Sequence, residues 1–158
     1  MTGSLQVSSQ SITAGAIANE CGCNGPGVSP QISWTEPPPG TKSFALIMDD
    51  KDSPFGYVQR HYFVHWLAFE LPADKRELSA AQPRQSLPDG TQQGTNDVDE
   101  LGYSGPCPDT GTTHHYAITI YALDTRVGLP ATTRVPALLK AIDGHVLARG
   151  QIVGTYAH

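Results

Sequence analysis

The sequence contains few basic residues and no long apolar run. Ten Lys and Arg stand against fifteen Asp and Glu, which gives a formal net charge of -5. Nucleic-acid binding depends on clustered Lys and Arg, so this composition argues against a nucleic-acid partner. No apolar stretch reaches the roughly 18 residues of a membrane-spanning helix, so no transmembrane segment is expected. The start, Met-Thr-Gly-Ser-Leu-Gln, lacks the features of a secretory signal, and the predicted location is therefore cytoplasmic.

Cysteine is also scarce, with residues at 21, 23 and 107. An odd number of cysteines in a reducing compartment usually indicates free thiols. Cys21 and Cys23 resemble the start of a zinc knuckle, but no second Cys or His pair lies at the required spacing. No metal or cofactor is therefore predicted. A bridge from Cys21 or Cys23 to Cys107 stays open, because sequence alone does not show whether they approach each other.

Several catalytic motifs are absent as well. The sequence has no phosphate-binding Walker loop and no dinucleotide-binding Gly-x-Gly-x-x-Gly fingerprint. Gly102-Tyr-Ser-Gly-Pro106 resembles a nucleophile elbow only in part, because Pro106 stands where that motif requires glycine. The one His-x-x-x-His spacing, His61 and His65, does not lie on a predicted helix, where such a pair would share a face, so it does not support a metal-dependent enzyme.

What is present is a set of short apolar runs rich in β-branched and aromatic residues. Such runs, bounded by turn residues, are typical of buried strands. Strands are predicted at Ser43–Met48, Tyr62–Phe69, Tyr116–Leu123 and Gln151–Tyr156, with further strands at Leu5–Ile12 and Ile32–Trp34. Alternation in the second run predicts that Phe63, His65 and Leu67 share one face.

One helix is predicted to begin near Pro136 and to end by Gly150, because Leu138, Leu139, Ile142 and Val146 recur at helical spacing. A short helical turn is also expected at Ala73–Leu78. These elements predict a single domain over residues 1–158, mainly β, with a β-sandwich decorated by helices.

Two long loops separate the predicted strands. Asn19–Pro30 is rich in Gly and Cys, and Ser79–His115 runs for 37 residues. Loops of this length in a compact domain are usually functional or disordered. The apolar residues Leu87, Val98, Leu101 and Tyr103 indicate that the second loop is held in place, which favours a functional role.

Polar residues of three segments predict one binding pocket. The run Asp49-Asp-Lys-Asp-Ser-Pro54 follows a predicted strand, and His65 interrupts an apolar one. Its imidazole needs polar partners if it is buried, and nearby carboxylates would supply them. The segment Gly102–Tyr116 combines Gly and Pro residues with His114 and Tyr116, so it predicts a rigid loop with exposed N–H groups suited to a small anion. The structural alternatives are an ordinary Asp/Pro turn, a satisfied core histidine and a solvated strand entry.

Together these segments resemble the phosphatidylethanolamine-binding protein family, specifically its bacterial and archaeal branch of Raf-kinase-inhibitor-like proteins. The order and spacing of the matching pieces hold across nearly the whole chain. They are Ser29-Pro30, Ser33-Trp34, Pro39–Leu46, Asp50-Lys-Asp-Ser-Pro54, His65-Trp66, Gly102–Pro108, His114-His-Tyr116, Tyr121–Asp124, His145–Ala148 and Gly154-Thr-Tyr156.

The resemblance implies a Greek-key β-sandwich with one helix in the C-terminal region, short extra helices and a pocket for phosphate or phosphoryl headgroups. The implied ligand-binding residues are Asp50, Asp52, Pro54, His65, Gly105, Pro106, Pro108, His114 and Tyr116. Two positions depart from the family's pattern. Lys51 replaces the usual proline, which makes the aspartate turn less rigid and more positive, and His115 replaces a customary arginine.

The function expected on these grounds is non-enzymatic binding of a small anionic ligand, with modulation of a protein partner in the manner of kinase or protease inhibitors. Two alternatives stay open. One is a protein-interaction module in which the pocket is incidental. The other is a weak hydrolase that uses His65 and Asp50 as an acid/base pair. The oligomeric state is expected to be a monomer or a homodimer.

Overall fold

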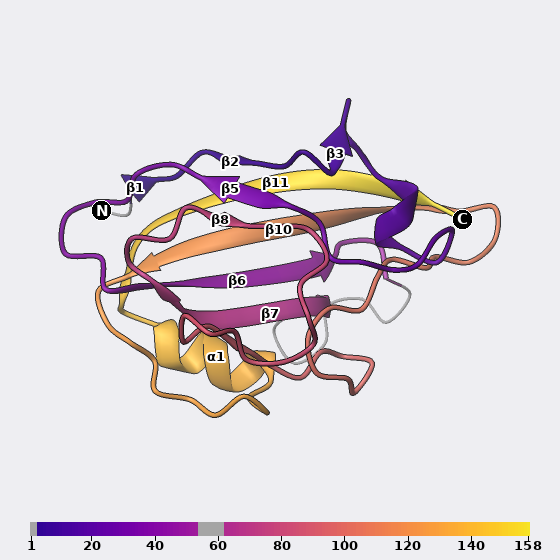
Figure 1. The fold of residues 1–158 in the computed structure, drawn as a ribbon. Coiled ribbons are helices and arrows are strands. Elements are labelled where there is room, and N and C mark those ends of the chain that lie inside the picture. The colour runs from indigo at the N-terminus through magenta and orange to yellow at the C-terminus, as the bar shows by residue number, and fades with distance from the viewer. Residues whose placement is uncertain (1–2, 54–61) are drawn as a thin grey trace.

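Two sheets, one α-helix and a 3₁₀ turn make up residues 3–53 and 62–158, the part of the chain that the computed structural model describes (Figure 1). The elements are β1 (Gly3–Ser4), β2 (Val7–Ser8), β3 (Ile12–Thr13), β4 (Ala16–Ile17), η1 (Asn19–Cys21), β5 (Ile32–Trp34), β6 (Ser43–Asp50), β7 (Phe63–Pro72), β8 (Glu77–Leu78), β9 (Gln92–Gln93), β10 (Thr113–Leu123), α1 (Val135–Ile142) and β11 (Val146–Ala157). The large sheet is mixed, with the order β3-β4-β11-β10-β6-β7-β9 and with β1 beside β11. The small sheet has the order β2-β5-β8.

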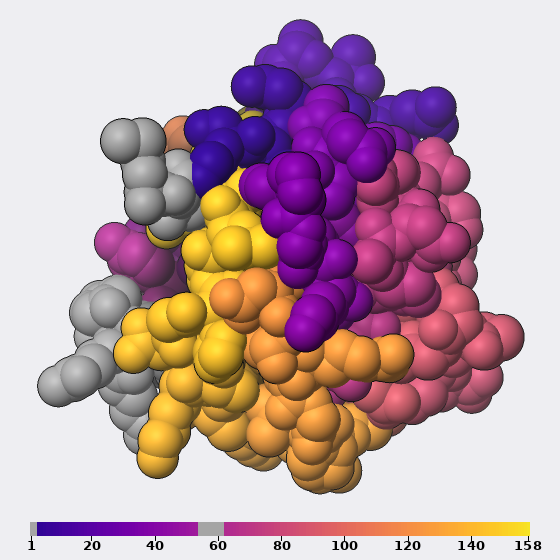
Figure 2. Space-filling view, turned by 90° about the vertical axis from the view of Figure 1, so that its left-hand side faces the viewer, coloured from indigo at the N-terminus to yellow at the C-terminus, as the bar shows by residue number. Residues whose placement is uncertain are grey.

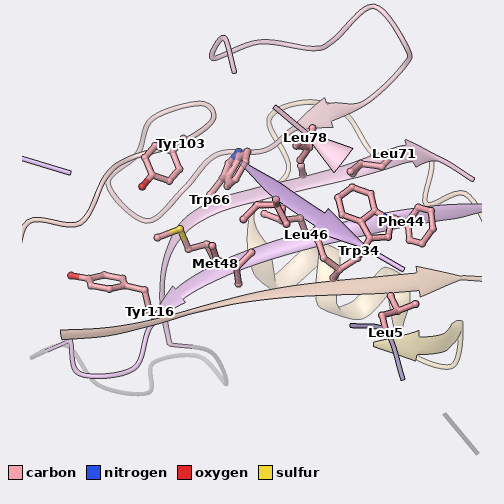
Figure 3. Packing of buried hydrophobic residues seen from close by; sticks show 14 of the residues in the cluster. Leu5, Trp34, Phe44, Leu46, Met48, Trp66, Leu71, Leu78, Tyr103 and Tyr116 are labelled. Carbon is pink, nitrogen blue, oxygen red and sulfur yellow. The ribbon is translucent and has the colours of Figure 1, made fainter. Parts of the chain in front are cut away.

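The central strands of the large sheet are apolar on both faces because both faces are covered. Along β6, Leu46 and Met48 pack toward the small sheet (Figure 3), in one cluster with Trp34 of β5. Ala45 and Ile47 point the other way and belong to a second cluster with α1. Strands that are covered on both faces have nearly continuous apolar sequences. The predicted strands at Ser43–Met48 and Tyr116–Leu123 were recognisable for this reason, and the structure confirms them as β6 and β10.

The mainly β fold with a small second sheet and one helix confirms the expected fold class. The predicted strand at Tyr62–Phe69 corresponds to β7, and the one at Ile32–Trp34 corresponds to β5. The outer strand expected at Leu5–Ile12 is instead broken into the short strands β2 and β3. In the described part of the chain, no helix is long and apolar enough to cross a membrane.

The helix prediction was too long at its C-terminal end. Helix α1 ends at Ile142, and Val146 is the first residue of β11. Gly144 between them has φ +81°, which suits a turn and not a helix interior. Gly150, expected to end the helix, lies inside β11, where an added Cβ would come within 2.2 Å of the Leu5 carbonyl oxygen. Glycine is therefore needed at 150 because the N-terminal segment packs against the strand.

The short helix expected at Ala73–Leu78 was wrong. Residues 73 and 74 form a turn, and Glu77–Leu78 is the strand β8. Leu78 is paired with Ile32 of β5 and is buried. Pairing with a neighbouring strand satisfies the backbone there, and local sequence does not reveal such a partner.

The face assignment for β7 was also wrong beyond His65. The pairing with β6 shifts register between Met48 and Asp49, which are opposite Trp66 and Val64. Val64 and Leu67 lie in the α1 cluster, whereas Trp66 packs on the other face. A β-bulge of this kind lets successive side chains share a face and is frequent beside functional sites. His65 and Trp66 thus lie on the same side of the sheet.

A disulfide joins the two long loops. Cys23 and Cys107 are bridged, with their Cα atoms 5.2 Å apart, so these two are not free thiols. Cys21 is the free one and is buried. Gly105 fits between the loops only because it lacks a Cβ, which would lie 2.5 Å from the Cys21 carbonyl oxygen. The second loop is also held by Tyr103, whose hydroxyl donates to that same oxygen at 2.7 Å.

Candidate functional site

A cavity of about 280 Å³ lies where β6 ends and where β7 and β10 begin. Tyr116 of β10 pairs with Asp50 of β6, which pairs in turn with Phe63 of β7. Three strands separated in sequence therefore bring their ends together. The lining residues are Asp50, Ser53, Phe63, His65, Val98, Ser104, Gly105, Cys107, Pro108, Asp109, His114 and Tyr116.

The carboxylate of Asp50 is buried, lines one wall of this cavity and positions His114 through a hydrogen bond. One of its oxygens accepts from His114 Nδ1 at 2.8 Å, and the other accepts from the backbone N–H of Asp52 at 2.8 Å. The Asp50 side chain is only 7% exposed and the His114 side chain 15%. Both carboxylate oxygens are thus engaged within the protein. A ligand would meet His114 held by Asp50 at this wall.

His65 is held by a backbone carbonyl. Its Nδ1 lies 2.8 Å from the Ser104 oxygen, which can only accept, so Nδ1 carries the proton. The neutral ring then has an unprotonated Nε2 that can accept a hydrogen bond. Burial lowers the pKa of His65, although the Ser104 carbonyl and the charge of Asp50 act in the opposite direction. His65 is therefore a neutral acceptor at neutral pH.

The ring of Tyr116 contacts both histidines of the cavity. Its ring lies edge-on to His65, with centroids 5.3 Å apart, and is stacked beside His114 at 6.3 Å. Burial, together with the charges of Asp50 and Asp52, raises the pKa of Tyr116 well above its ordinary value. The hydroxyl consequently stays protonated and can donate a hydrogen bond.

Six of the nine residues predicted from sequence lie around this cavity: Asp50, His65, Gly105, Pro108, His114 and Tyr116. Asp52 and Pro106 do not line it. Asp52 turns outward to His115, whose Nδ1 and backbone N–H both donate to it at 2.7 Å. Pro106 is buried, and its carbonyl accepts from the N–H of Cys23 at 3.0 Å. Pro54 lies outside the described residues.

The two departures from the family's pattern lie away from the cavity. Lys51 is beside a second depression on the α1 side of the sheet, with its ammonium 4.7 Å from the centre of the Tyr62 ring. Lys51 directly follows β6 and lies beside Asp49, whereas Asp50 lines the cavity on the other face. Lys51 therefore does not make the cavity more positive, and His115 is paired with Asp52 outside it.

Sequence reasoning missed several lining residues. Ser104, Cys107 and Asp109 belong to the loop whose Gly and Pro content marked it, so their proximity was a usable signal. Val98 was expected to anchor that loop, yet it is 40% exposed and lies beside the cavity. The buried side chain of Asn96 accepts from the backbone N–H of Val98 and from that of Glu100, which holds this turn. No local pattern distinguishes Val98 from an apolar anchor.

Similarity to known proteins covers nearly the whole chain. A family model described as phosphatidylethanolamine-binding protein matches residues 8–157. A UPF0098 protein of Methanothermobacter thermautotrophicus is 40% identical over 143 residues, which cover 90% of this chain and 91% of that protein. The UPF0098 protein YbhB of Escherichia coli is 37% identical over 144 residues, covering 90% of this chain and 80% of that one.

Solved structures agree with this assignment. The crystal structure of E. coli YbcL, described as a new member of the mammalian PEBP family, has a TM-score of 0.86 at 28% identity, with 98% of each chain covered. A homologue of phosphatidylethanolamine-binding protein from Chlamydia trachomatis has a TM-score of 0.85 at 31% identity, with 99% of each chain covered. With its family match, its fold and its relatives, this chain belongs to the phosphatidylethanolamine-binding protein family, in the bacterial and archaeal UPF0098 branch.

Proposed function

We propose that the protein binds a small phosphoryl anion in the cavity bounded by Asp50, His65, His114 and Tyr116, and that it does so without chemical turnover. The observation that carries the proposal is that both histidines are fixed through Nδ1, by Asp50 and by the Ser104 carbonyl. Each ring therefore has Nε2 as its remaining polar atom. Family membership supports the same ligand class.

The electrostatics of this pocket favour a partly protonated anion. Asp50 would repel phosphate directly, but its two oxygens are occupied by His114 and the Asp52 N–H. When protonated, His114 forms an ion pair with Asp50 and can donate from Nε2. Neutral His65 offers a matching acceptor for a P–OH group, and the Tyr116 hydroxyl is a further donor. We accordingly expect binding to strengthen as the pH falls through the histidine range.

The hydrolase alternative is less well supported by these contacts. An acid/base pair requires hydrogen-bond reach between its members or through a reacting atom. Among the described residues, the Asp50 carboxylate is bonded to His114 and to Asp52, and His65 is bonded to Ser104. Binding without chemistry, with modulation of a protein partner, is the function we propose.

The cytoplasmic location stays a prediction. The Cys23–Cys107 bridge weighs against it, because structural disulfides persist mainly in oxidising compartments in mesophiles. Intracellular proteins of hyperthermophiles are an exception to that rule.

Calorimetric titration with inorganic phosphate and phosphoethanolamine, at about pH 5.5 and about pH 8, tests the proposed function. We expect tighter binding at the lower pH and a loss of at least about tenfold in affinity for His114→Ala, the cost of one charge-assisted contact. His145→Ala is the matched control, because His145 forms a similar pair with Asp124 at the far end of β10. Equal affinities at both pH values, or equal losses in both variants, would contradict the proposal.

A further inference from the structure

Three exposed side chains of types that can bind metals meet at one edge of the described structure. Cys23 follows η1, Cys107 belongs to the loop that lines the cavity, and His158 follows β11. One ligand atom from each lies within 4.8 Å of the other two. The spacing of the cysteines in the sequence did not indicate this grouping, because the third ligand comes from the far end of the chain.

The backbones around this cluster are held independently of the disulfide. The N–H of Cys23 donates to the Pro106 carbonyl at 3.0 Å. His158 accepts from the N–H of Gly111 at 2.7 Å and donates its own N–H to the Thr112 carbonyl at 3.2 Å. The two sulfurs would therefore stay near each other and near the imidazole after the bridge opens.

The imidazole of His158 is also oriented by the loop of Cys107. Its Nδ1 is 2.9 Å from the Pro108 carbonyl oxygen and 3.8 Å from Cys107 Sγ. Nδ1 is thus the ring nitrogen nearest the Cys107 sulfur, and binding a metal through it would replace its hydrogen bond to the Pro108 carbonyl. Cys21 is not part of this cluster. It is buried, and burial raises the pKa of its thiol to about 11.

We propose that reduction of the Cys23–Cys107 bridge produces a Zn²⁺ site made of these two thiolates and the His158 imidazole. Zn²⁺ takes sulfur and nitrogen ligands in a tetrahedron, with metal–ligand distances that separate neighbouring ligands by about 3.5–3.8 Å. The three ligand atoms lie within 4.8 Å of one another in this structure, so small side-chain rotations would bring them to that spacing. Three protein ligands leave the fourth position for water, and the soft thiolates favour Zn²⁺ over Mg²⁺ or Ca²⁺.

The redox step balances with a dithiol as the co-reactant. Its thiolate attacks one sulfur of the bridge to form a mixed disulfide, and its second thiol then displaces the protein sulfur. The dithiol becomes a cyclic disulfide and supplies two electrons and two protons, so Cys23 and Cys107 each become a thiol. Binding of Zn²⁺ then releases one proton from each thiol.

Cobalt spectroscopy tests this proposal in the full chain. The protein is reduced without air by a phosphine, which is oxidised to its oxide and does not compete as a dithiol chelator would. Co²⁺ is then titrated while thiolate-to-cobalt charge-transfer absorbance is followed, and Zn²⁺ is added to displace it. We expect one Co²⁺ per reduced chain and none per oxidised chain. Cys107→Ser should abolish the band, and His158→Ala should weaken binding by at least about tenfold.

Two variants serve as controls, with folding checked by circular dichroism. Cys21→Ser removes the buried third thiol, and His145→Ala removes an exposed histidine that pairs with Asp124. Both should retain the affinity of the reduced wild type. The proposal is overturned if reduced wild type gives no charge-transfer band, if Cys107→Ser keeps the band, or if His158→Ala binds as tightly as wild type. The comparison of oxidised with reduced wild type requires no variant to fold.

Discussion

Two imidazole–carboxylate pairs stand at opposite ends of β10 with nearly the same geometry. His114 Nδ1 lies 2.8 Å from Asp50, and His145 Nδ1 lies 2.7 Å from Asp124. The side chains of the first pair are 15% and 7% exposed, whereas those of the second are 46% and 43% exposed. Figure 2 faces the end that carries the second pair, where the purple segment after β5 and the orange and yellow segments around α1 form the surface.

The two pairs have nearly the same hydrogen-bond length but differ in exposure, so the length alone does not distinguish a pair in a cavity from a pair on the surface. Asp50 and His114 are enclosed by Tyr116 and by the Gly105–Pro108 loop, so water screens them little. The pair of His145 and Asp124 is surrounded by solvent, where such pairs contribute little to stability. The enclosure is supplied by loops distant in sequence.

Opening the Cys23–Cys107 bridge should have the largest effect on stability, because it removes a cross-link that restricts the unfolded chain. The two cysteines are 84 residues apart, and the chain-entropy model gives a stabilisation of about 4–5 kcal/mol for such a loop. Urea unfolding of wild type with and without reductant measures the change. A loss below about 1 kcal/mol would mean that the reduced unfolded chain is already constrained.

Asp50→Asn should destabilise the protein more than the same change at the exposed pair. Asp50 is buried and accepts two hydrogen bonds, and loss of charged hydrogen bonds at a buried site costs about 2–3 kcal/mol. Asp124→Asn, its matched control, should cost under about 1 kcal/mol. Free energies of unfolding from urea titrations at neutral pH give both values. Equal losses would show that enclosure does not strengthen the Asp50 pair.

Lowering the pH should weaken the enclosed end through His65. Its folded-state pKa is lowered by burial, so the unfolded state takes up the proton first as the pH falls below about 6.5. Stability is therefore full above that pH and declines below it, by at most about 1.4 kcal/mol per pH unit for one group. His65→Gln retains a donor for the Ser104 carbonyl and should show a shallower decline in unfolding free energy between about pH 7 and pH 5. The same slope in both proteins would contradict this assignment.

The strands at the sheet centre were predictable because their environment leaves a local record. Residues 43–48 and 116–123 are covered on both faces, and a largely apolar run suits such a position. The matching motifs also placed Asp50, His65, His114 and Tyr116 near one another, and these four do line one cavity.

The missed features all depend on partners elsewhere in the chain. Leu78 is a strand residue because Ile32 pairs with it, and Gly150 lies in a strand because Leu5 crosses it closely. The register shift opposite Met48 decides which way Trp66 faces. None of these partners is within ten residues, so propensity and periodicity carry no information about them.

The amino-acid sequence by itself determined the fold class, the central strands and the residue types available for an anion site, because burial on two faces and polar side chains at strand ends are local properties. Only the tertiary structure decided that Asp50 is hydrogen-bonded to His114, that Asp52 and Lys51 turn elsewhere, and that Cys23 lies beside Cys107 and His158. The physical reason is that side-chain direction depends on strand register, and loop contacts depend on backbone packing across the whole domain.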